Sequence, residues 1–319
     1  MFFSLEGECE IDTGSTRPIA CKNPKFGPQE TSIIEKAISK LLDLKHIIQF
    51  FSGEWLSKLL LVAKPHQENV TCIDNFVWHF CVSYVALNLV TRIIAMPIPC
   101  CDEAVGNTFG MSQFRWLMDA ISGYNQIRVA KSSQEKLAFA GPGCTKYTWL
   151  VMPFGPINGP VIFIVLIHGM NSTWQELART CGIVFDADTG TEIIVDDVFS
   201  WAKTWSDFMT YLECQLQVCL SQNLSLSLKK SLFCPDHLEF VGVDVDSEGN
   251  CPAMSKHSFV LSFPIFETVR DIASFLGFMM FYSKWIAHFE QQAAPLHALV
   301  KNDMTTPVAH LMKEAKLAS

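Results

Sequence analysis

The chain has 319 residues and a formal net charge of −8, and 49% of its residues are hydrophobic. This composition excludes an intrinsically disordered chain and allows either one large domain or two. Its longest apolar runs, 161–167 and 272–282, are shorter than the roughly 20 residues of a membrane-spanning helix. Because the N-terminus also lacks a signal-peptide pattern, we expect an intracellular protein, cytoplasmic or nuclear, that is not secreted and does not bind membranes.

The first 30 residues contain several Gly and Pro breakers and are expected to form an extended linker. A helix is predicted over 32–44, because apolar residues recur there at helical spacing. Ser32 and Glu35 have the spacing of a capping box and would start this helix.

The next part of the chain alternates between strand and helix signals. Apolar runs at 58–64 and 80–88 predict strands. The segments 136–140 and 146–152 flank the turn-rich sequence GPGC and predict a hairpin. A helix is predicted from about 161 to 170, after the Gly- and Pro-rich sequence MPFGPINGP.

The second half of the chain begins with the β-branched run 193–199, which predicts a strand or a hairpin tip. An amphipathic helix is predicted over 206–222, a strand over 238–245, and helices after about 267. Strands and helices that do not strictly alternate favour an α+β fold. Twelve cysteines without a C-x-x-C pair exclude a zinc ribbon of ordinary spacing and favour reduced thiols.

Two adjacent carboxylates, Asp196 and Asp197, interrupt the apolar run IIVDDVF. Buried charges are costly unless they are paired or bind metal. A two-metal phosphoryl-transfer site needs carboxylates from separate strands, and Asp119 in LMDAISGYNQI could supply the second arm. Backbone amides in the turn at Ser122 and Gly123 could hold a triphosphate. Each fragment taken alone is a weak signal, because an Asp-Asp pair is more often a solvated turn or a loose cation site.

The order of the segments is more informative than any one of them. Eight segments follow one another with short spacings: WHFCVSYVALN, LMDAISGYNQI, EKLAF, VMPFGPINGP, IIVDDV, LSLSLKKSLF, LEFVGVDVDSEG and IASFLGFMMFYSKWI. Together they resemble the reverse transcriptase of gypsy-type LTR retrotransposon Pol polyproteins, and more distantly retroviral polymerases, over about residues 10–300.

This resemblance implies a right-hand polymerase of α+β class, with a palm built on an antiparallel sheet. Residues 1–30 would be a linker, 31–255 the fingers and palm, and 256–319 a thumb-like helical segment that ends before any ribonuclease H domain. The implied activity is RNA-directed DNA synthesis, in which deoxynucleotides are added to a primer 3′-hydroxyl. The implied partners are deoxynucleoside triphosphates and an RNA or DNA template with its primer, beside other polyprotein domains.

The resemblance also assigns roles to individual residues. Asp119, Asp196 and Asp197 match the catalytic aspartates, which hold two Mg²⁺ or Mn²⁺ ions, and Lys230 or its neighbour Lys229 matches a lysine that protonates the leaving pyrophosphate. The remaining matches concern the nucleotide site, at Lys64, His79, Ser122, Gly123, Tyr124, Phe154 and Gly155, and the primer grip, at Val241 and Gly242. Tyr124 would lie under the sugar and exclude a 2′-hydroxyl group.

Departures from the family pattern leave a second hypothesis open. His79 and Val85 stand where the family has arginines, Ile194 replaces a tyrosine, and a neutral imidazole lacks the forked donors of arginine. Together with the acidic net charge, these changes allow a decayed copy that binds nucleic acid at most. The sequence DTGS at Asp12 allows a third hypothesis, a retropepsin-like protease fragment.

Overall fold

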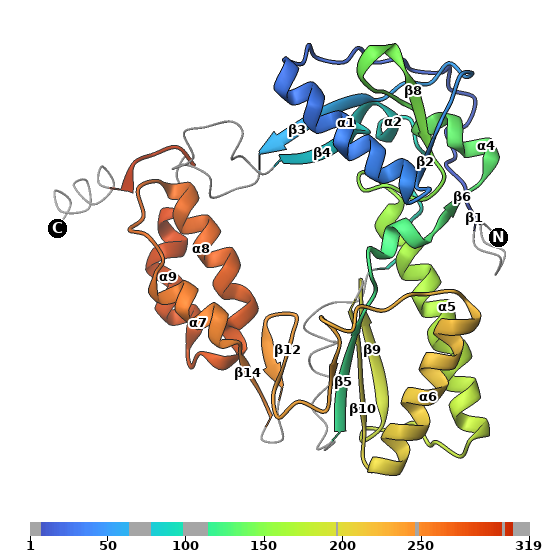
Figure 1. The fold of residues 1–319 in the computed structure, drawn as a ribbon. Helices are drawn as coiled ribbons and strands as arrows, with labels where there is room; N and C mark the ends of the chain where they lie inside the picture. Colours follow the sequence, from blue (N-terminus) through green and yellow to red (C-terminus); the bar gives the residue numbers. More distant parts are fainter. Residues whose placement is uncertain are drawn as a thin grey trace.

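The computed structural model describes residues 8–63, 78–97, 114–195, 197–245, 249–301 and 304–308, and Figure 1 shows their arrangement. The elements form three successive groups, which we call the fingers, the palm and the thumb. The thumb helices lie apart from the fingers and join the palm through a small sheet. Within the described part of the chain, no helix is both long enough and apolar enough to cross a bilayer.

The palm is a four-stranded antiparallel sheet with the strand order β11-β5-β10-β9. Its strands are β5 (Phe114–Asp119), β9 (Gly190–Ile194), β10 (Asp197–Ala202) and β11 (Leu232–Phe233). Helices α5 (Gly159–Thr180) and α6 (Trp205–Ser221) contact each other and the sheet strands. Side chains alternate along β5, so that Trp116 and Met118 are buried in the core that includes both helices.

A polar network crosses the palm core and fixes the sheet against α6. The Trp116 Nε1–H donates to Gln215 Oε1 at 2.7 Å, and the Gln215 Nε2–H donates to Ser200 Oγ at 2.9 Å. Gln215 is fully buried, and each of these groups would be costly to leave without a partner. The palm is therefore held by apolar packing and by matched polar groups.

The fingers combine a helix with two small sheets. The elements are α1 (Pro28–Asp43), β2 (Ile47–Gln49), β3 (Lys58–Ala63), β4 (Trp78–Ser83), α2 (Val85–Asn88), α4 (Lys131–Gln134), β7 (Phe139–Ala140) and β8 (Lys146–Trp149). The sheets are a β3-β4 hairpin and the order β2-β8-β7. One hydrophobic core joins the fingers to the palm, and it includes Ile34, Leu59 and Phe139.

The N-terminal segment is tied to this body. Strand β1 (Glu8–Cys9) pairs in parallel with β6 (Arg128–Val129), and Cys9 and Ile11 are buried in the main core. The Ile11 N–H donates to Ser133 Oγ at 2.9 Å. The predicted linker therefore packs against the fingers from residue 8 onward, while the domain limits given above remain predictions.

The thumb begins after a second, smaller antiparallel sheet. Its strands and helices are β12 (Leu238–Phe240), β13 (Val243–Val245), β14 (Asn250–Pro252), α7 (Met254–Leu261), α8 (Val269–Tyr282) and α9 (Phe289–Leu299). The small sheet packs on the palm through stacked rings of Phe199 and Phe240, whose centroids lie 4.9 Å apart. Helices α8 and α9 share a core of their own that contains Ile272, Leu276 and Ala293.

Several predicted elements are confirmed. Helix α6 lies within one residue of the predicted 206–222, and the segments around GPGC form the β7-β8 hairpin. The IIVDDVF run forms the β9-β10 hairpin. The α+β class and the antiparallel palm sheet are confirmed as well.

Four predicted elements were wrong in their limits. The helix predicted from about 161 to 170 is the longer α5, Gly159–Thr180. Helix α1 begins at Pro28, where Glu30 accepts the Gly27 N–H, so the capping box at Ser32 and Glu35 does not form. The strand predicted over 80–88 ends at Ser83, where the chain enters α2. The strand predicted over 238–245 is a hairpin, since the backbone reverses at residues 241–242.

Candidate carboxylate site and nucleotide pocket

Two predicted catalytic aspartates meet at one end of the palm sheet. Asp119 is the last residue of β5 and Asp197 is the first of β10, and the two are Cα partners in the antiparallel ladder. Directly opposed side chains of such a pair lie on the same face, with Cβ atoms about 5 Å apart. The third predicted aspartate, Asp196, lies outside the described residues. The fold thus brings together carboxylates that are 78 positions apart in the sequence.

Both strand ends at this site carry strained backbone. Ile194 at the end of β9 pairs with Asp197 at the start of β10, and Val195, which follows Ile194, has a φ of 55°. Ser122, three residues after Asp119, has a φ of 46°. Side-chain-bearing residues rarely adopt this left-handed region, and strain of this kind costs about 1–3 kcal/mol and is concentrated at functional sites.

The surroundings of Asp119 hold it in place and shield it from solvent. Only 13% of its side chain is exposed, and Oδ2 lies 3.3 Å from Lys230 Nζ. The Asp119 N–H donates to Ser231 Oγ at 3.2 Å, and its carbonyl accepts the Ser227 N–H at 2.8 Å. The other carboxylate oxygen, Oδ1, is buried without a hydrogen-bond partner in the described structure.

The carboxylate oxygens at this site fit a hard divalent cation. Mg²⁺ and Mn²⁺ prefer carboxylate oxygens, and a buried carboxylate oxygen without a donor is stabilised by a bound cation. Asp119 and Asp197 supply carboxylates from separate strands. No group of three His, Cys, Asp or Glu side chains with metal-binding geometry is found among the residues described, a set that does not include Asp196.

A cavity of about 310 Å³ is lined by Tyr124, Pro153, Phe154, Gly155, Pro156, Ile157, Gly159 and Pro160. The ring of Tyr124 contacts Phe154 and Phe163 edge-on, at centroid distances of 5.0 and 5.6 Å. Gly123 and Tyr124 belong to a 3₁₀ turn (Gly123–Gln126) that follows β5. The fold therefore brings Tyr124, Phe154 and Gly155 to one cavity, while Ser122 and Gly123 lie in the turn that follows Asp119; the roles of these residues in nucleotide binding remain predictions.

Asn88, which has no predicted role, fixes one wall of this cavity. Asn88 donates from Nδ2 to the Gly155 carbonyl and accepts the Ile157 N–H on Oδ1, both at 2.9 Å. Tyr84 packs close to Gly155, and burial raises its pKa, so that its ring stays neutral. The only sequence signal for Asn88 is its place at the end of the segment WHFCVSYVALN.

The remaining predicted residues lie farther out or are not described. His79 is exposed on β4, opposite Val62, and Lys64 lies outside the described residues. Val241 and Gly242 form the β12-β13 turn with positive φ values of 52° and 78°. The Gly242 carbonyl accepts the Tyr282 hydroxyl at 3.2 Å, which links this turn to the thumb.

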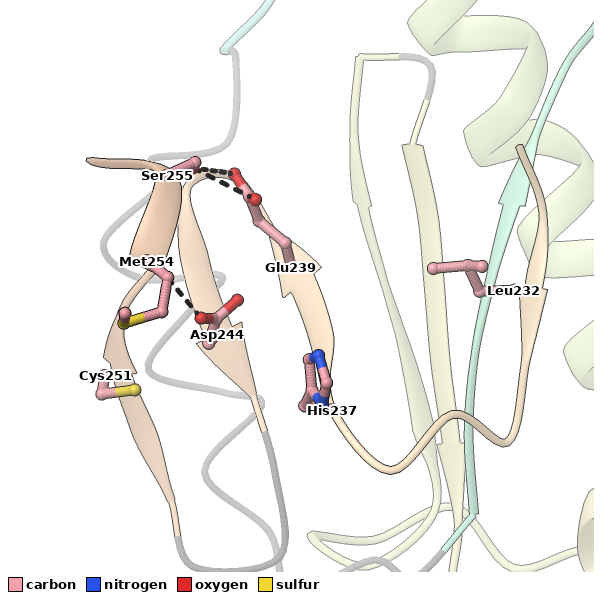
Figure 2. A pocket seen from close by; sticks show the side chains of 7 residues that line it. All are labelled: Leu232, His237, Glu239, Asp244, Cys251, Met254 and Ser255. Atoms are coloured by element: carbon pink, nitrogen blue, oxygen red, sulfur yellow. Dashed lines mark hydrogen bonds between the residues drawn. The ribbon is translucent and has the colours of Figure 1, made fainter. Parts of the chain in front are cut away.

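A larger cavity of about 550 Å³ lies between β11 and the small sheet (Figure 2), lined by Leu232, His237, Glu239, Asp244, Cys251, Met254 and Ser255. Glu239 and Asp244 are directly opposed on β12 and β13. The Ser255 hydroxyl donates to Glu239 at 3.3 Å, and the Met254 N–H donates to Asp244 at 3.2 Å. The two carboxylates thus anchor the first turn of α7, which has no side-chain cap of its own.

Comparisons with known proteins show a similarity to reverse transcriptases. Residues 96–245 match the family model "Reverse transcriptase (RNA-dependent DNA polymerase)". The Retrovirus-related Pol polyprotein from transposon opus of Drosophila melanogaster is 25% identical over 319 residues, which are 98% of this chain and 30% of that protein. The corresponding polyprotein from transposon gypsy of the same organism is 25% identical over 73% of this chain and 21% of its own length.

The fold is similar to that of a solved structure, the foamy viral protease-reverse transcriptase in complex with double-stranded DNA. The TM-score is 0.76 with 19% sequence identity, and the match covers 94% of this chain and 49% of that one. The chain therefore spans less than half of each relative. From the family model and the relatives, we conclude that residues 96–245 match a reverse transcriptase domain and that the chain is distantly related to the Pol polyproteins of gypsy-type and retroviral elements.

Proposed function

We propose that the chain is an RNA-directed DNA polymerase that adds deoxynucleotides to a primer 3′-hydroxyl. The observation that supports this most directly is the carboxylate pair, in which Asp119 and Asp197 are opposed across β5 and β10. The buried Oδ1 of Asp119, without a hydrogen-bond partner among the described residues, supports a cation at this position. Asp119, Asp196 and Asp197 would hold two Mg²⁺ or Mn²⁺ ions, which when bound stabilise negative charge on the attacking and leaving oxygens.

The other residues of the site position the incoming nucleotide. Tyr124 and Phe154 form an aromatic wall of the cavity, against which the sugar of a nucleotide would lie. Backbone amides of the turn at Ser122 and Gly123 would hold the triphosphate. Asn88 keeps the Phe154–Gly155 loop in place through its two hydrogen bonds to that loop.

The partners of this activity are a primer annealed to RNA or DNA, and deoxynucleoside triphosphates. The foamy viral relative was solved with double-stranded DNA, which supports a duplex ligand for the same fold. In this proposal the small sheet at Val241 and Gly242 contacts the primer end, and the helices α7 to α9 contact the duplex.

Primer extension on an RNA template tests the proposal. Asp119→Asn and Asp196→Asn should each lower the rate by three or more orders of magnitude, a loss of about 4 kcal/mol of transition-state stabilisation. Asp236→Asn is a matched control, because Asp236 is an exposed aspartate between β11 and β12, and this variant should extend primers normally. Extension at the wild-type rate by Asp119→Asn would refute the assignment.

A second candidate is an inactive remnant that binds nucleic acid without extending it. It is favoured by His79 and Val85, which are exposed at positions where the resemblance predicts arginines. A folded wild-type protein that binds a primer–template duplex but extends no primer with Mg²⁺ or Mn²⁺ would establish this alternative.

The protease hypothesis is not favoured, because Asp12 is engaged in the fingers. It accepts the Gly14 N–H at 2.8 Å and pairs with Arg92 at 3.2 Å. The Gly14 N–H, and to a lesser degree Arg92, lower the pKa of Asp12. Asp12 is therefore a stable carboxylate, whereas an aspartic-protease dyad must share a proton.

A further inference from the structure

Lys230 makes a contact that affects the carboxylate site before any substrate binds. We propose that Lys230 is the resident counter-ion of Asp119 and lowers the affinity of this site for divalent cations, so that cation binding displaces its ammonium group. This inference rests on the proposed function, because it takes Asp119 as a cation ligand. It goes beyond that function in assigning Lys230 a role in the absence of nucleotide and primer.

The first support is the unequal use of the two Asp119 oxygens. Lys230 Nζ lies 3.3 Å from Oδ2, while Oδ1 is buried and has no hydrogen-bond partner among the described residues. The ammonium group therefore neutralises the carboxylate from one side only. A cation that binds the carboxylate has to compete with this existing ion pair.

The second support is that the Lys230 backbone is fixed while its side chain can withdraw. The Lys230 N–H donates to the Ser227 carbonyl at 3.1 Å, and the neighbouring Ser231 accepts the Asp119 N–H. Ser231 is buried, but 69% of the Lys230 side chain is exposed. The ammonium group can thus move into water without breaking the contacts that brace the end of β5.

Removing the charge of Lys230 should therefore strengthen cation binding for two reasons. The ion pair no longer has to be broken, and the bound cation no longer lies beside a positive charge. For a partly exposed ion pair, the loss of the pair and of the repulsion between Lys230 and the cation together should lower the cation dissociation constant about three- to tenfold. A purely structural role for Lys230 predicts the opposite sign, because a damaged site binds cations more weakly.

The test is a titration of the full chain with Mn²⁺, followed by electron paramagnetic resonance of the free ion, without nucleotide or primer. Lys230→Gln should lower the Mn²⁺ dissociation constant about three- to tenfold, and Lys230→Arg, which keeps the charge, should leave it close to wild type. Lys229→Gln is the matched control, since Lys229 is the exposed neighbour, and it should change the constant less than twofold. This control separates the effect of losing the Lys230–Asp119 contact from the general effect of losing one positive charge.

The outcomes also separate this inference from the proposed function. If wild type binds Mn²⁺, Asp119→Asn does not, and Lys230→Gln binds no tighter than wild type, the role of Lys230 is wrong and the metal site stands. If wild type binds no Mn²⁺, or binds it as Asp119→Asn does, both the metal site and the inference fall. An equal gain in affinity for Lys229→Gln and Lys230→Gln would also overturn the inference.

Discussion

Replacing Gly123 by alanine would test the packing of the turn after β5 against Phe163, which also contacts Tyr124. A Cβ built on Gly123 lies 2.6 and 2.7 Å from Cζ and Cε2 of Phe163. Favourable contacts between carbon atoms begin at about 3.5 Å, so the ring would have to move by about 1 Å. Phe163 is only 1% exposed, and its neighbours include the Tyr124 ring. Overpacking of this kind costs about 1–3 kcal/mol of folding free energy.

The measurement is the midpoint of urea unfolding, monitored by circular dichroism. It is made for Gly123→Ala and for a control variant, Gly169→Ala, in the same helix as Phe163. Gly169 lies in the middle of α5, and a Cβ added there would meet no described atom within 4 Å outside the backbone of its own helix. Gly169→Ala should therefore raise stability by up to about 1 kcal/mol, because alanine is the better helix former. The two glycine-to-alanine changes are thus expected to have opposite signs.

A second substitution decides whether the clash with Phe163 is the cause. Phe163→Leu shortens the side chain, so the loss caused by Gly123→Ala should be smaller in that background than in wild type. Under the proposed function, Gly123→Ala should also raise the nucleotide KM, since a displaced Tyr124 ring narrows the cavity. A Gly123→Ala variant as stable as wild type, or an equal loss in both backgrounds, would refute this reasoning.

Three further predictions concern other parts of the chain. His79→Arg should lower the nucleotide KM about tenfold in steady-state primer extension, because a charge-assisted contact contributes about 1.5–3 kcal/mol; equal KM values would show that His79 does not contact the triphosphate. The backbone N–H and the hydroxyl of Thr268 lower the pKa of Asp271 in the folded chain. The ionised Asp271 therefore stabilises the fold fully above the unfolded-state pKa of about 3.9, and this stabilisation is lost as the pH falls through the lower folded-state pKa. Asp271→Asn should accordingly reduce the drop in thermal midpoint between pH 5 and pH 3, and an unchanged drop would contradict the cap. Gln215→Leu should destabilise the chain by about 1–3 kcal/mol in urea unfolding, because it leaves the buried Trp116 N–H without an acceptor; a neutral result would show that the polar network is dispensable.

The parts of the fold that depend on local periodicity could be predicted from the sequence. Helix α6 has buried residues at helical spacing, among them Phe208, Tyr211 and Val218, and its limits were predicted within one residue. The carboxylate site was predictable only from the order of the motifs. Asp119 and Asp197 face each other only because of the register between β5 and β10, and the local sequence around neither residue specifies this register.

Long-range contacts override local signals at the β12-β13 turn and at Asn88. The sequence LEFVGVDV alternates like a strand, but Val241 adopts a φ of 52° that its own side chain disfavours. The turn is held instead by Gly242, whose carbonyl accepts the Tyr282 hydroxyl and the Ala253 N–H. The clamp of Asn88 on the loop at Gly155 likewise joins residues 67 positions apart. Neither set of partners can be read from a short segment.

The rigidity of the palm explains how Asp197 can stand in the apolar run IIVDDVF. The β9-β10 hairpin opposes the carboxylates of Asp119 and Asp197, and like charges in that relation are destabilising. It also places Val195 in a strained conformation. These costs are local and of the order of a few kcal/mol, whereas the palm beneath them is anchored by fully buried rings such as Trp116 and Tyr211. A site with unfavourable electrostatics can persist on such a rigid base, and Lys230 provides part of the missing positive charge. The rigid palm thus keeps the carboxylates of Asp119 and Asp197 opposed despite their mutual repulsion.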